Sequence, residues 1–263
     1  MADEKEVVSE RRGNVLVLRI NRPEARNSLN PAVMAGIGAG LIEAETDPEI
    51  RAIVLTGTGD RAFCGGMDLA AFASGNMGGG GDIDPKAMAR FQPFMSKGEC
   101  TVPVIGAANA TAVAGGFELL MACDMIVAAE GSKFGLPEVK RGLFAAGGGM
   151  FLAKRIPLAK ALELTLTGDY IEAEEAVGLG LVNKIVPADQ VLDAALELAG
   201  KIAANGPLGV AATKELVRMA ASSPADDVWK VHAERQATVF SSEDAKEGSM
   251  AFIEKRDPVW QGK

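Results

Sequence analysis

The chain has 263 residues and a net charge of −8, from 27 Lys and Arg against 35 Asp and Glu. This length suits one large domain or two small ones, and a hydrophobic content of 48% is typical of a globular protein with a core. An acidic chain lacks the basic face that sequence-independent nucleic-acid binding requires. A single His makes His-ligated metal sites and a Ser-His-Asp triad improbable. We therefore expect no nucleic-acid partner, no metal, and acid–base chemistry carried by other side chains.

Localisation is predicted from three features of the sequence. Residues 1–12 are polar and acidic, unlike a signal or transit peptide. The longest uncharged run, residues 100–117, contains Pro103, Asn109 and a Gly pair, so we expect no membrane span. The three Cys form no C-x-x-C motif and cannot all pair, which indicates buried thiols in a reducing compartment. These features favour a cytoplasmic protein.

The predicted elements alternate between strands and helices in the first half of the chain. Apolar, β-branched runs predict strands at residues 14–20, 50–56, 101–108 and 125–128. Helices are expected over about 30–44, 86–97 and 116–122, with a Gly-rich loop at 74–85. After a short strand at 182–186, amphipathic helices are expected near 188–204, 207–221, 224–240 and 243–254. This order predicts an α/β fold with a mainly parallel sheet, followed by a helical layer.

Glycines occur at three predicted turns, and each of these turns has a possible functional interpretation. Residues 57–62 spell G-x-G-x-x-A after a strand, but the helix that a dinucleotide site needs does not follow, so a tight turn is the better interpretation. Gly65-Gly66 follows that turn, and Gly115-Gly116 begins a predicted helix. Glycine lets successive N–H groups point at one ligand, so these two pairs could together form an oxyanion hole. Each pair alone is equally typical of a turn or close packing.

Two glutamates accompany these glycine pairs. Glu118 lies in the first turn of the helix that begins near Gly115, and Glu138, in the stretch FGLPE, is expected in a loop that follows a strand. Two carboxylates in one pocket can divide acid and base roles. Spacing alone favours solvated surface positions for both.

Taken together, these segments resemble the crotonase superfamily, the enoyl-CoA hydratase/isomerase family. The resemblance covers nearly the whole chain and rests on an ordered set of motifs. They are residues 20–29 (INRPEARNSL), 52–57 (AIVLTG), 62–69 (AFCGGMDL), 114–124 (AGGFELLMACD), 134–142 (FGLPEVKRG), 166–169 (LTGD), 178–187 (GLGLVNKIVP) and 242–256 (SEDAKEGSMAFIEKR).

The resemblance implies a crotonase-like spiral of ββα units over residues 1–200 and a C-terminal helical region over 201–263. That second region would drive assembly of a homotrimer or a dimer of trimers and complete the CoA pocket. The implied ligand is an acyl-CoA thioester, with no cofactor besides the CoA of the substrate. The implied reaction is addition of water across the 2,3 double bond of a trans-2-enoyl-CoA.

The resemblance also assigns site residues. Glu118 and Glu138 fall on the catalytic positions, and the backbone N–H groups of Met67 and Gly115 fall on the oxyanion hole. Our working assignment is Glu118 activating water and Glu138 protonating the α-carbon. The expected substrate and CoA contacts are Ala25, Arg26, Ser28, Gly65, Gly66, Asp68, Leu69, Gly116, Pro137 and Ala146.

The chain departs from the family pattern after Glu138, where residues 142–148 are GLFAAGG. Ala146 stands where the hydratases carry a Gly, and Phe144 is bulkier than usual. These changes would reshape the acyl pocket. Alternatives are an enoyl-CoA isomerase, a dehydratase of another hydroxyacyl-CoA such as carnitinyl-CoA, or an acyl-CoA-binding protein without catalysis.

Overall fold

A six-stranded sheet forms the centre of the computed structural model, which describes residues 5–73 and 83–263. Its strand order is β1-β2-β3-β4-β6-β9, and only the β1–β2 pair is antiparallel. The strands are β1 (Val7–Arg12), β2 (Val15–Ile20), β3 (Ala52–Gly57), β4 (Val104–Ala108), β6 (Met125–Ala129) and β9 (Lys184–Val186). The predicted parallel-rich sheet is therefore confirmed.

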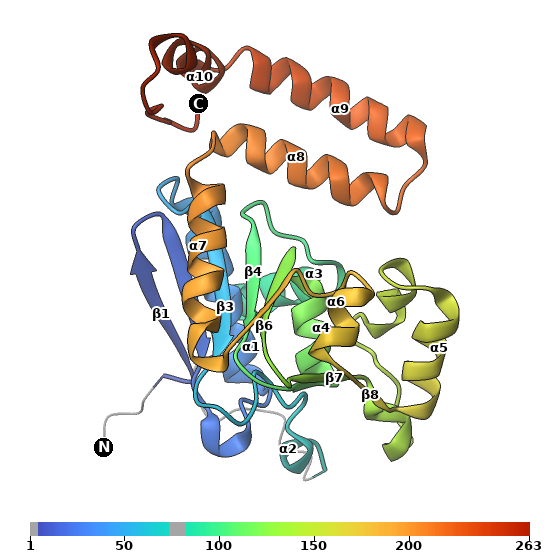
Figure 1. Ribbon diagram of the computed structural model, residues 1–263. Coiled ribbons are helices and arrows are strands. Elements are labelled where there is room, and N and C mark those ends of the chain that lie inside the picture. The colour runs from blue at the N-terminus through green and yellow to red at the C-terminus, as the bar shows by residue number, and fades with distance from the viewer. Residues whose placement is uncertain (1–4, 74–82) are drawn as a thin grey trace.

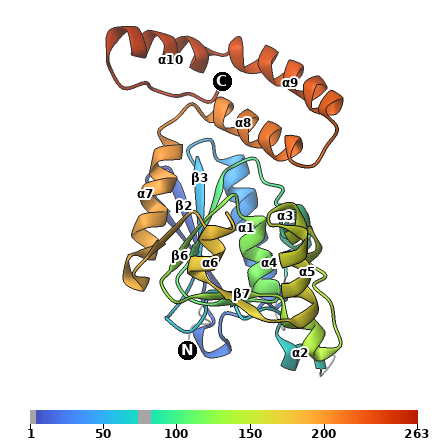
Figure 2. The same cartoon turned by 45° about the vertical axis from the view of Figure 1, so that its right-hand side comes forward.

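Helices cover both faces of this sheet (Figures 1 and 2). Helix α7 (Val191–Ala203) packs on one face through Val191, Ala195 and Ala199. The opposite face carries α1 (Pro31–Thr46), α3 (Pro85–Lys97) and α4 (Gly115–Ala122). Since neither face meets water, every residue of β3 and β4 is buried. The core is continuous from the sheet to α4.

A small second sheet lies beneath the large one and carries short elements around it (Figure 1). It joins β5 (Ala112–Val113), β7 (Lys133–Gly135) and β8 (Tyr170–Glu172). The remaining short elements are η1 (Pro23–Ala25), α2 (Leu69–Ala73), η2 (Pro137–Arg141), η3 (Gly149–Lys154), α5 (Leu158–Thr167), α6 (Ala173–Gly178) and η4 (Ala188–Gln190). Most of the predicted site residues lie in these short segments or between them.

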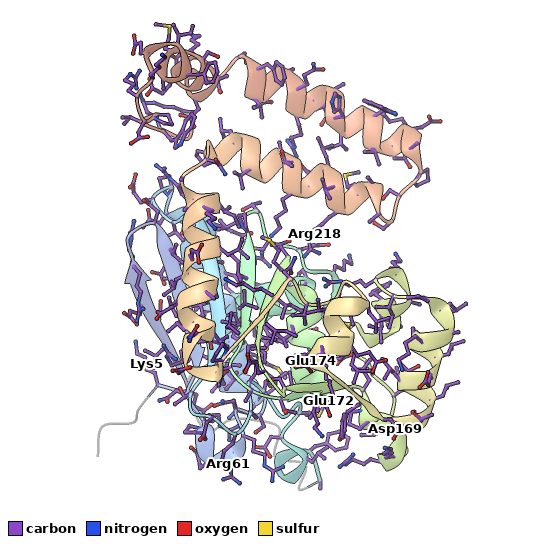
Figure 3. All side chains as sticks on the ribbon, viewed as in Figure 1. Lys5, Arg61, Asp169, Glu172, Glu174 and Arg218 are labelled. Carbon is purple, nitrogen blue, oxygen red and sulfur yellow. The ribbon has the colours of Figure 1, made fainter. Side chains whose placement is uncertain are left out.

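The C-terminal helices α8 (Pro207–Ala220), α9 (Ala225–Phe240) and α10 (Glu243–Glu254) stand beyond the sheet (Figure 1). Helices α8 and α9 bury no residue. Lys214 and Arg218 tie α8 to the core, because each lies 2.7 Å from a carboxylate oxygen of Asp124. Figure 3 shows Arg218 between α8 and the core. The predicted helical region is present and is attached to the core by ion pairs.

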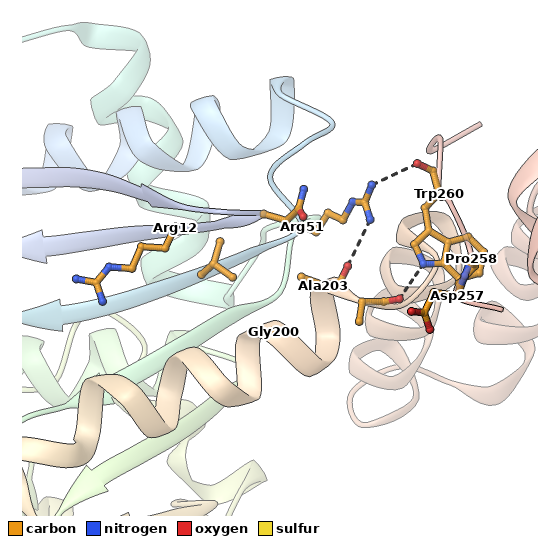
Figure 4. A pocket seen from close by; sticks show the side chains of 10 residues that line it. Arg12, Arg51, Gly200, Ala203, Asp257, Pro258 and Trp260 are labelled. Carbon is orange, nitrogen blue, oxygen red and sulfur yellow. Dashed lines mark hydrogen bonds between the residues drawn. The ribbon is translucent and has the colours of Figure 1, made fainter.

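The last residues of the chain fold back onto the core through Trp260. Its indole N–H donates to the carbonyl of Ala204 at 2.8 Å, and its carbonyl accepts from Arg51 at 3.3 Å. A cavity of about 380 Å³ lies at this seam (Figure 4). None of the residues that line it is a predicted site residue. This cavity marks the junction between the core and the tail.

The predicted helices and strands occur within a few residues of their expected bounds, and Asn30 caps α1 by accepting from the N–H of Val33 at 2.9 Å. The expected loop at 74–85 lies mostly outside the described residues. Strands β1, β5, β7 and β8 were not predicted. Strand β1 is an edge strand with five exposed residues, and the other three have two or three residues each, too few to show a period. No described helix is both long and apolar enough to cross a bilayer.

Candidate active site

The two glycine pairs lie against each other in the structure. A Cβ atom placed on Gly66 would be 3.2 Å from the nitrogen of Gly115, and one on Gly115 would be 3.7 Å from the nitrogen of Met67. Among the described residues, the Met67 and Gly115 N–H groups donate to no acceptor. Gly66 has φ 89°, a conformation that favours glycine. The fold therefore brings two free backbone donors together, as an oxyanion hole requires.

Strained backbone directs the start of α4 toward this point. Ala114, the residue before the helix, has φ 52° and ψ −133°, a conformation that side chains with a Cβ rarely adopt. Its N–H donates to the carbonyl of Gly135 on β7 at 2.9 Å, which helps to hold it in place. Strain of this kind concentrates at functional sites. Here it orients the N–H of Gly115.

Glu118 lies on α4 one turn after Gly115 and is only 4% exposed. Its Oε1 accepts hydrogen bonds from the N–H groups of Gly147 and Gly149, at 2.9 and 2.7 Å. Burial raises the pKa of Glu118 above its ordinary value, and these two amide donors oppose that rise. The carboxylate is thus held at one position while remaining able to take up a proton.

Glu138 is the second residue of η2 and faces the same site. Its Oε2 is buried and has no hydrogen-bond partner among the described residues. Burial raises the pKa of Glu138, and the negative charge of nearby Glu118 adds to the rise. Two neighbouring carboxyl groups can divide acid and base roles when their surroundings differ, and here Glu118 accepts two amide hydrogen bonds whereas Oε2 of Glu138 accepts none from the described part of the chain.

A cavity of about 360 Å³ opens beside Glu138. It is bounded by η2, η3 and α5, and Gly149, which donates to Glu118, forms part of its wall. Its lining residues are Leu136, Glu138, Val139, Phe144, Ala145, Gly149, Met150, Leu152, Ala153, Leu158, Ala161, Leu162, Thr165 and Leu166. Glu138 therefore sits at one boundary of a largely apolar pocket, and Glu118 is linked to that pocket through Gly149.

The residues expected near CoA surround the Gly65-Gly66 loop. The carbonyl of Arg26, whose φ is 53°, accepts from the N–H of Gly65 at 2.9 Å. Arg22 organises two others, because it donates to the hydroxyl of Ser28 at 3.0 Å and to Asp68 at 3.2 Å. Among the others, Ala25 ends η1, and Leu69 begins α2 with 44% exposure. Arg22 is not among the site residues predicted from the sequence, although it lies within the INRPEARNSL motif.

The other expected contacts have different surroundings. Gly116 is packed so closely that a Cβ atom would overlap the carbonyl of Cys64, and Pro137 is buried at the start of η2. Ala146 is exposed, and the amides that reach Glu118 are those of Gly147 and Gly149. Sequence reasoning missed these two donors. The run of three glycines at 147–149 was the available signal.

Other reactive groups are less suited to acid–base work. Cys64 lies beside Gly116, but burial raises the pKa of its thiol to about 12. His232 is on α9, where its ring meets Trp229 edge to face. In residues 5–73 and 83–263 no three His, Cys, Asp or Glu side chains cluster as metal ligands would. Of the two glutamates, Glu138 lines the cavity, and Glu118 accepts a hydrogen bond from Gly149 in its wall.

A protein-family model described as enoyl-CoA hydratase/isomerase matches residues 10–263. The chain belongs to this family. The predicted relationship to the crotonase superfamily is thereby confirmed.

Two relatives show the spread of activities within the enoyl-CoA hydratase/isomerase family. The chain is 40% identical over 255 residues to enoyl-CoA hydratase EchA19 of Mycobacterium tuberculosis, covering 97% of this chain and 96% of that protein. It is 37% identical over 258 residues to a carnitinyl-CoA dehydratase of Salmonella paratyphi A, covering 96% and 97%. Both comparisons run nearly end to end.

The fold is shared with solved structures of this family. The crystal structure of an enoyl-CoA hydratase from Mycobacterium tuberculosis H37Rv superposes with a TM-score of 0.89 at 44% identity, covering 99% of this chain and 100% of that one. The predicted crotonase-like α/β fold with a C-terminal helical region is therefore confirmed.

Proposed function

We propose that this protein is an enoyl-CoA hydratase that adds water across the 2,3 double bond of a trans-2-enoyl-CoA to give a 3-hydroxyacyl-CoA. It is a hydro-lyase and needs no cofactor besides the CoA of its substrate. The observation that carries the proposal is the pair of neighbouring carboxyl groups with raised pKa values, Glu118 and Glu138. Glu118 follows Gly115 by one turn of α4, and the N–H groups of Gly115 and Met67 are free among the described residues.

In this mechanism the two N–H groups bind the thioester oxygen. As water attacks the β-carbon, electrons of the double bond move toward the thioester, and negative charge grows on that oxygen. Glu118 takes a proton from the water while the water oxygen bonds to the β-carbon, and Glu138 gives a proton to the α-carbon. Two amide donors already favour the carboxylate form of Glu118, which supports its assignment as the base. Oε2 of Glu138 has no such donor, which suits a group that keeps its proton until the reaction.

The remaining assignments complete this proposal. Two segments border the CoA thioester: one contains Ala25, Arg26 and Ser28, and the other contains Gly65, Gly66, Asp68 and Leu69. The reacting carbons are bordered by Gly116, Pro137 and Ala146. Residues 1–200 form the core that holds the site, and residues 201–263 assemble a homotrimer or a dimer of trimers in the cytoplasm. The absence of buried residues in α8 and α9 supports this assembly, because amphipathic helices gain stability by covering their apolar faces.

A second candidate is dehydration of carnitinyl-CoA, the activity named for the relative from Salmonella paratyphi A. Dehydration is the reverse type of step and uses the same two carboxyl groups. An isomerase needs only one carboxylate to move a proton, so retention of both favours a hydratase or dehydratase. The same retention argues against a binding protein without catalysis.

Activity is measured as the loss of absorbance of the conjugated thioester, because adding water to the 2,3 double bond of a trans-2-enoyl-CoA removes that conjugation. Glu118→Gln and Glu138→Gln should each lower kcat by about 10²–10⁴-fold, whereas Glu174→Gln, an exposed glutamate on α6 (Figure 3), should not. Gly115→Pro removes one backbone donor and should cost about 10²–10³-fold. No turnover of any enoyl-CoA by the folded protein, or full activity in both Gln variants, would overturn the assignment.

A further inference from the structure

The cavity beside Glu138 is lined mainly by apolar side chains and has few polar ones. Glu138 and the hydroxyl of Thr165 are its polar side chains, and all its other lining residues are apolar or glycine. Glu138 belongs to η2, whereas the wall continues onto α5 through Leu158, Leu162 and Leu166. The cavity thus leads from a carboxyl group to a row of leucines.

We propose that this cavity selects a neutral, extended acyl group with more than about four carbons and disfavours an acyl group that carries a quaternary ammonium. The inference rests on the proposed function and specifies the substrate class of the same site. It chooses between two kinds of substrate that the glutamate pair alone would accept.

The size of the cavity supports a long acyl group. A volume of about 360 Å³ falls within the range of ligand pockets, about 300–1,000 Å³. A crotonyl group, whose chain ends one carbon beyond the double bond, would leave most of the leucine row uncovered. Leu158, Leu162 and Leu166 are 62, 46 and 70% exposed, so a chain lying along α5 would remove apolar surface from water on both partners. Each methylene so buried should raise affinity severalfold.

The apolar lining of the cavity opposes a cationic acyl group. A trimethylammonium on the carbon after the double bond would lose water against leucine, methionine and alanine side chains. Recognition of such a cation usually uses several aromatic faces, but the one aromatic residue in this lining is Phe144, whose side chain is 73% exposed. The single lining carboxyl group, Glu138, is already committed to proton transfer in the proposed mechanism.

The test uses the wild-type protein and two sets of thioesters. In the first set, trans-2-enoyl-CoAs with four, six, eight and ten carbons should show kcat/KM rising at least tenfold from four to eight carbons. In the second set, crotonyl-CoA bearing a trimethylammonium on its fourth carbon is compared with 5,5-dimethylhex-2-enoyl-CoA, its neutral analogue of the same shape. The neutral thioester should have at least tenfold higher kcat/KM.

A variant pair tests the role of the leucine row. Leu162→Asp places a carboxylate on the wall, so the preference for eight over four carbons and the preference for the neutral analogue should both fall at least threefold. Ala159→Asp is the matched control on α5, because Ala159 is exposed and does not line the cavity. It should leave both ratios unchanged.

The outcomes separate this inference from the proposed function. Turnover that is highest with the four-carbon substrate, equal turnover of the charged and neutral analogues, or equal effects of the two Asp variants would overturn the substrate class while leaving a hydratase. Absence of turnover with every thioester would instead overturn the proposed function.

Discussion

Helices α4 and α9 differ in burial: α4 lies in the core, whereas α9 is largely exposed. Six of the eight residues of α4 are buried, including Glu118, whereas α9 has 16 residues and buries none. Trp229 and Phe240 of α9 remain 65 and 76% exposed. One chain is thus sufficient to fix the active-site helix, but it leaves the apolar side chains of the C-terminal helices uncovered. The difference supports the proposed assembly, in which a second copy of the chain covers the outer helices.

The largest expected effect comes from deleting a buried ring on α4. Phe117 is 1% exposed and stacks on Phe134 with ring centroids 5.7 Å apart. Phe117→Ala should lower the free energy of unfolding by about 3–5 kcal/mol because it leaves a cavity, as measured by urea denaturation. Trp229→Ala on α9 should instead lower the free energy of unfolding by an amount that depends on protein concentration. The same variant should form a weaker assembly in sedimentation experiments. A large loss of unfolding free energy in Trp229→Ala that does not depend on protein concentration would contradict this difference between α4 and α9.

The link between the two regions gives the next effect. Lys214 of α8 is only 9% exposed at its side chain, and it pairs with Asp124 just after α4. Lys214→Met should cost about 3 kcal/mol of unfolding free energy, because a largely buried carboxylate loses a partner. The exposed pair of Lys201 and Glu197 supplies the control, and Lys201→Met should change stability by less than about 1 kcal/mol. Equal losses in the two variants would show that burial does not distinguish these ion pairs.

A pH-dependent effect on stability is expected from Glu138. Burial raises the pKa of Glu138 above 4.5, so the folded chain binds this proton more tightly than the unfolded chain does. Stability is therefore lost as pH rises from 4.5 through the raised pKa. Glu138→Gln cannot titrate, and it should melt at a higher temperature than the wild type near neutral pH, with the difference shrinking below pH 4.5. A difference that stays constant over this range would contradict the expectation.

The smallest effect concerns the strained residue before α4. Ala114 has φ 52°, which glycine adopts without strain. Ala114→Gly should therefore raise the free energy of unfolding by about 1 kcal/mol. The substitution relieves the backbone strain of the folded state, and the greater entropy of the unfolded chain with glycine offsets part of that gain. Calorimetry would measure the shift. Ala159→Gly on α5 should be destabilising instead, since it lies within an ordinary helix.

The amino-acid sequence by itself was enough for the family, the order of the main elements and the glutamate pair. The long apolar runs of β2, β3 and β4 are local signals, because a fully buried strand must be apolar throughout. The motifs around Gly65-Gly66 and Gly115-Gly116 are equally local, and they identified the family together with Glu118 and Glu138.

Only the tertiary structure decided how these groups meet. The amides of Gly147 and Gly149 reach Glu118 from 29 and 31 residues away, a pairing that no local pattern encodes. The leucines of α5 form one wall with Glu138 because the second sheet places η2 beside that helix. Burial, hydrogen-bond partners and the shape of a cavity are properties of packing between distant segments. They determine the surroundings of Glu118 and Glu138, which the motifs locate only along the chain.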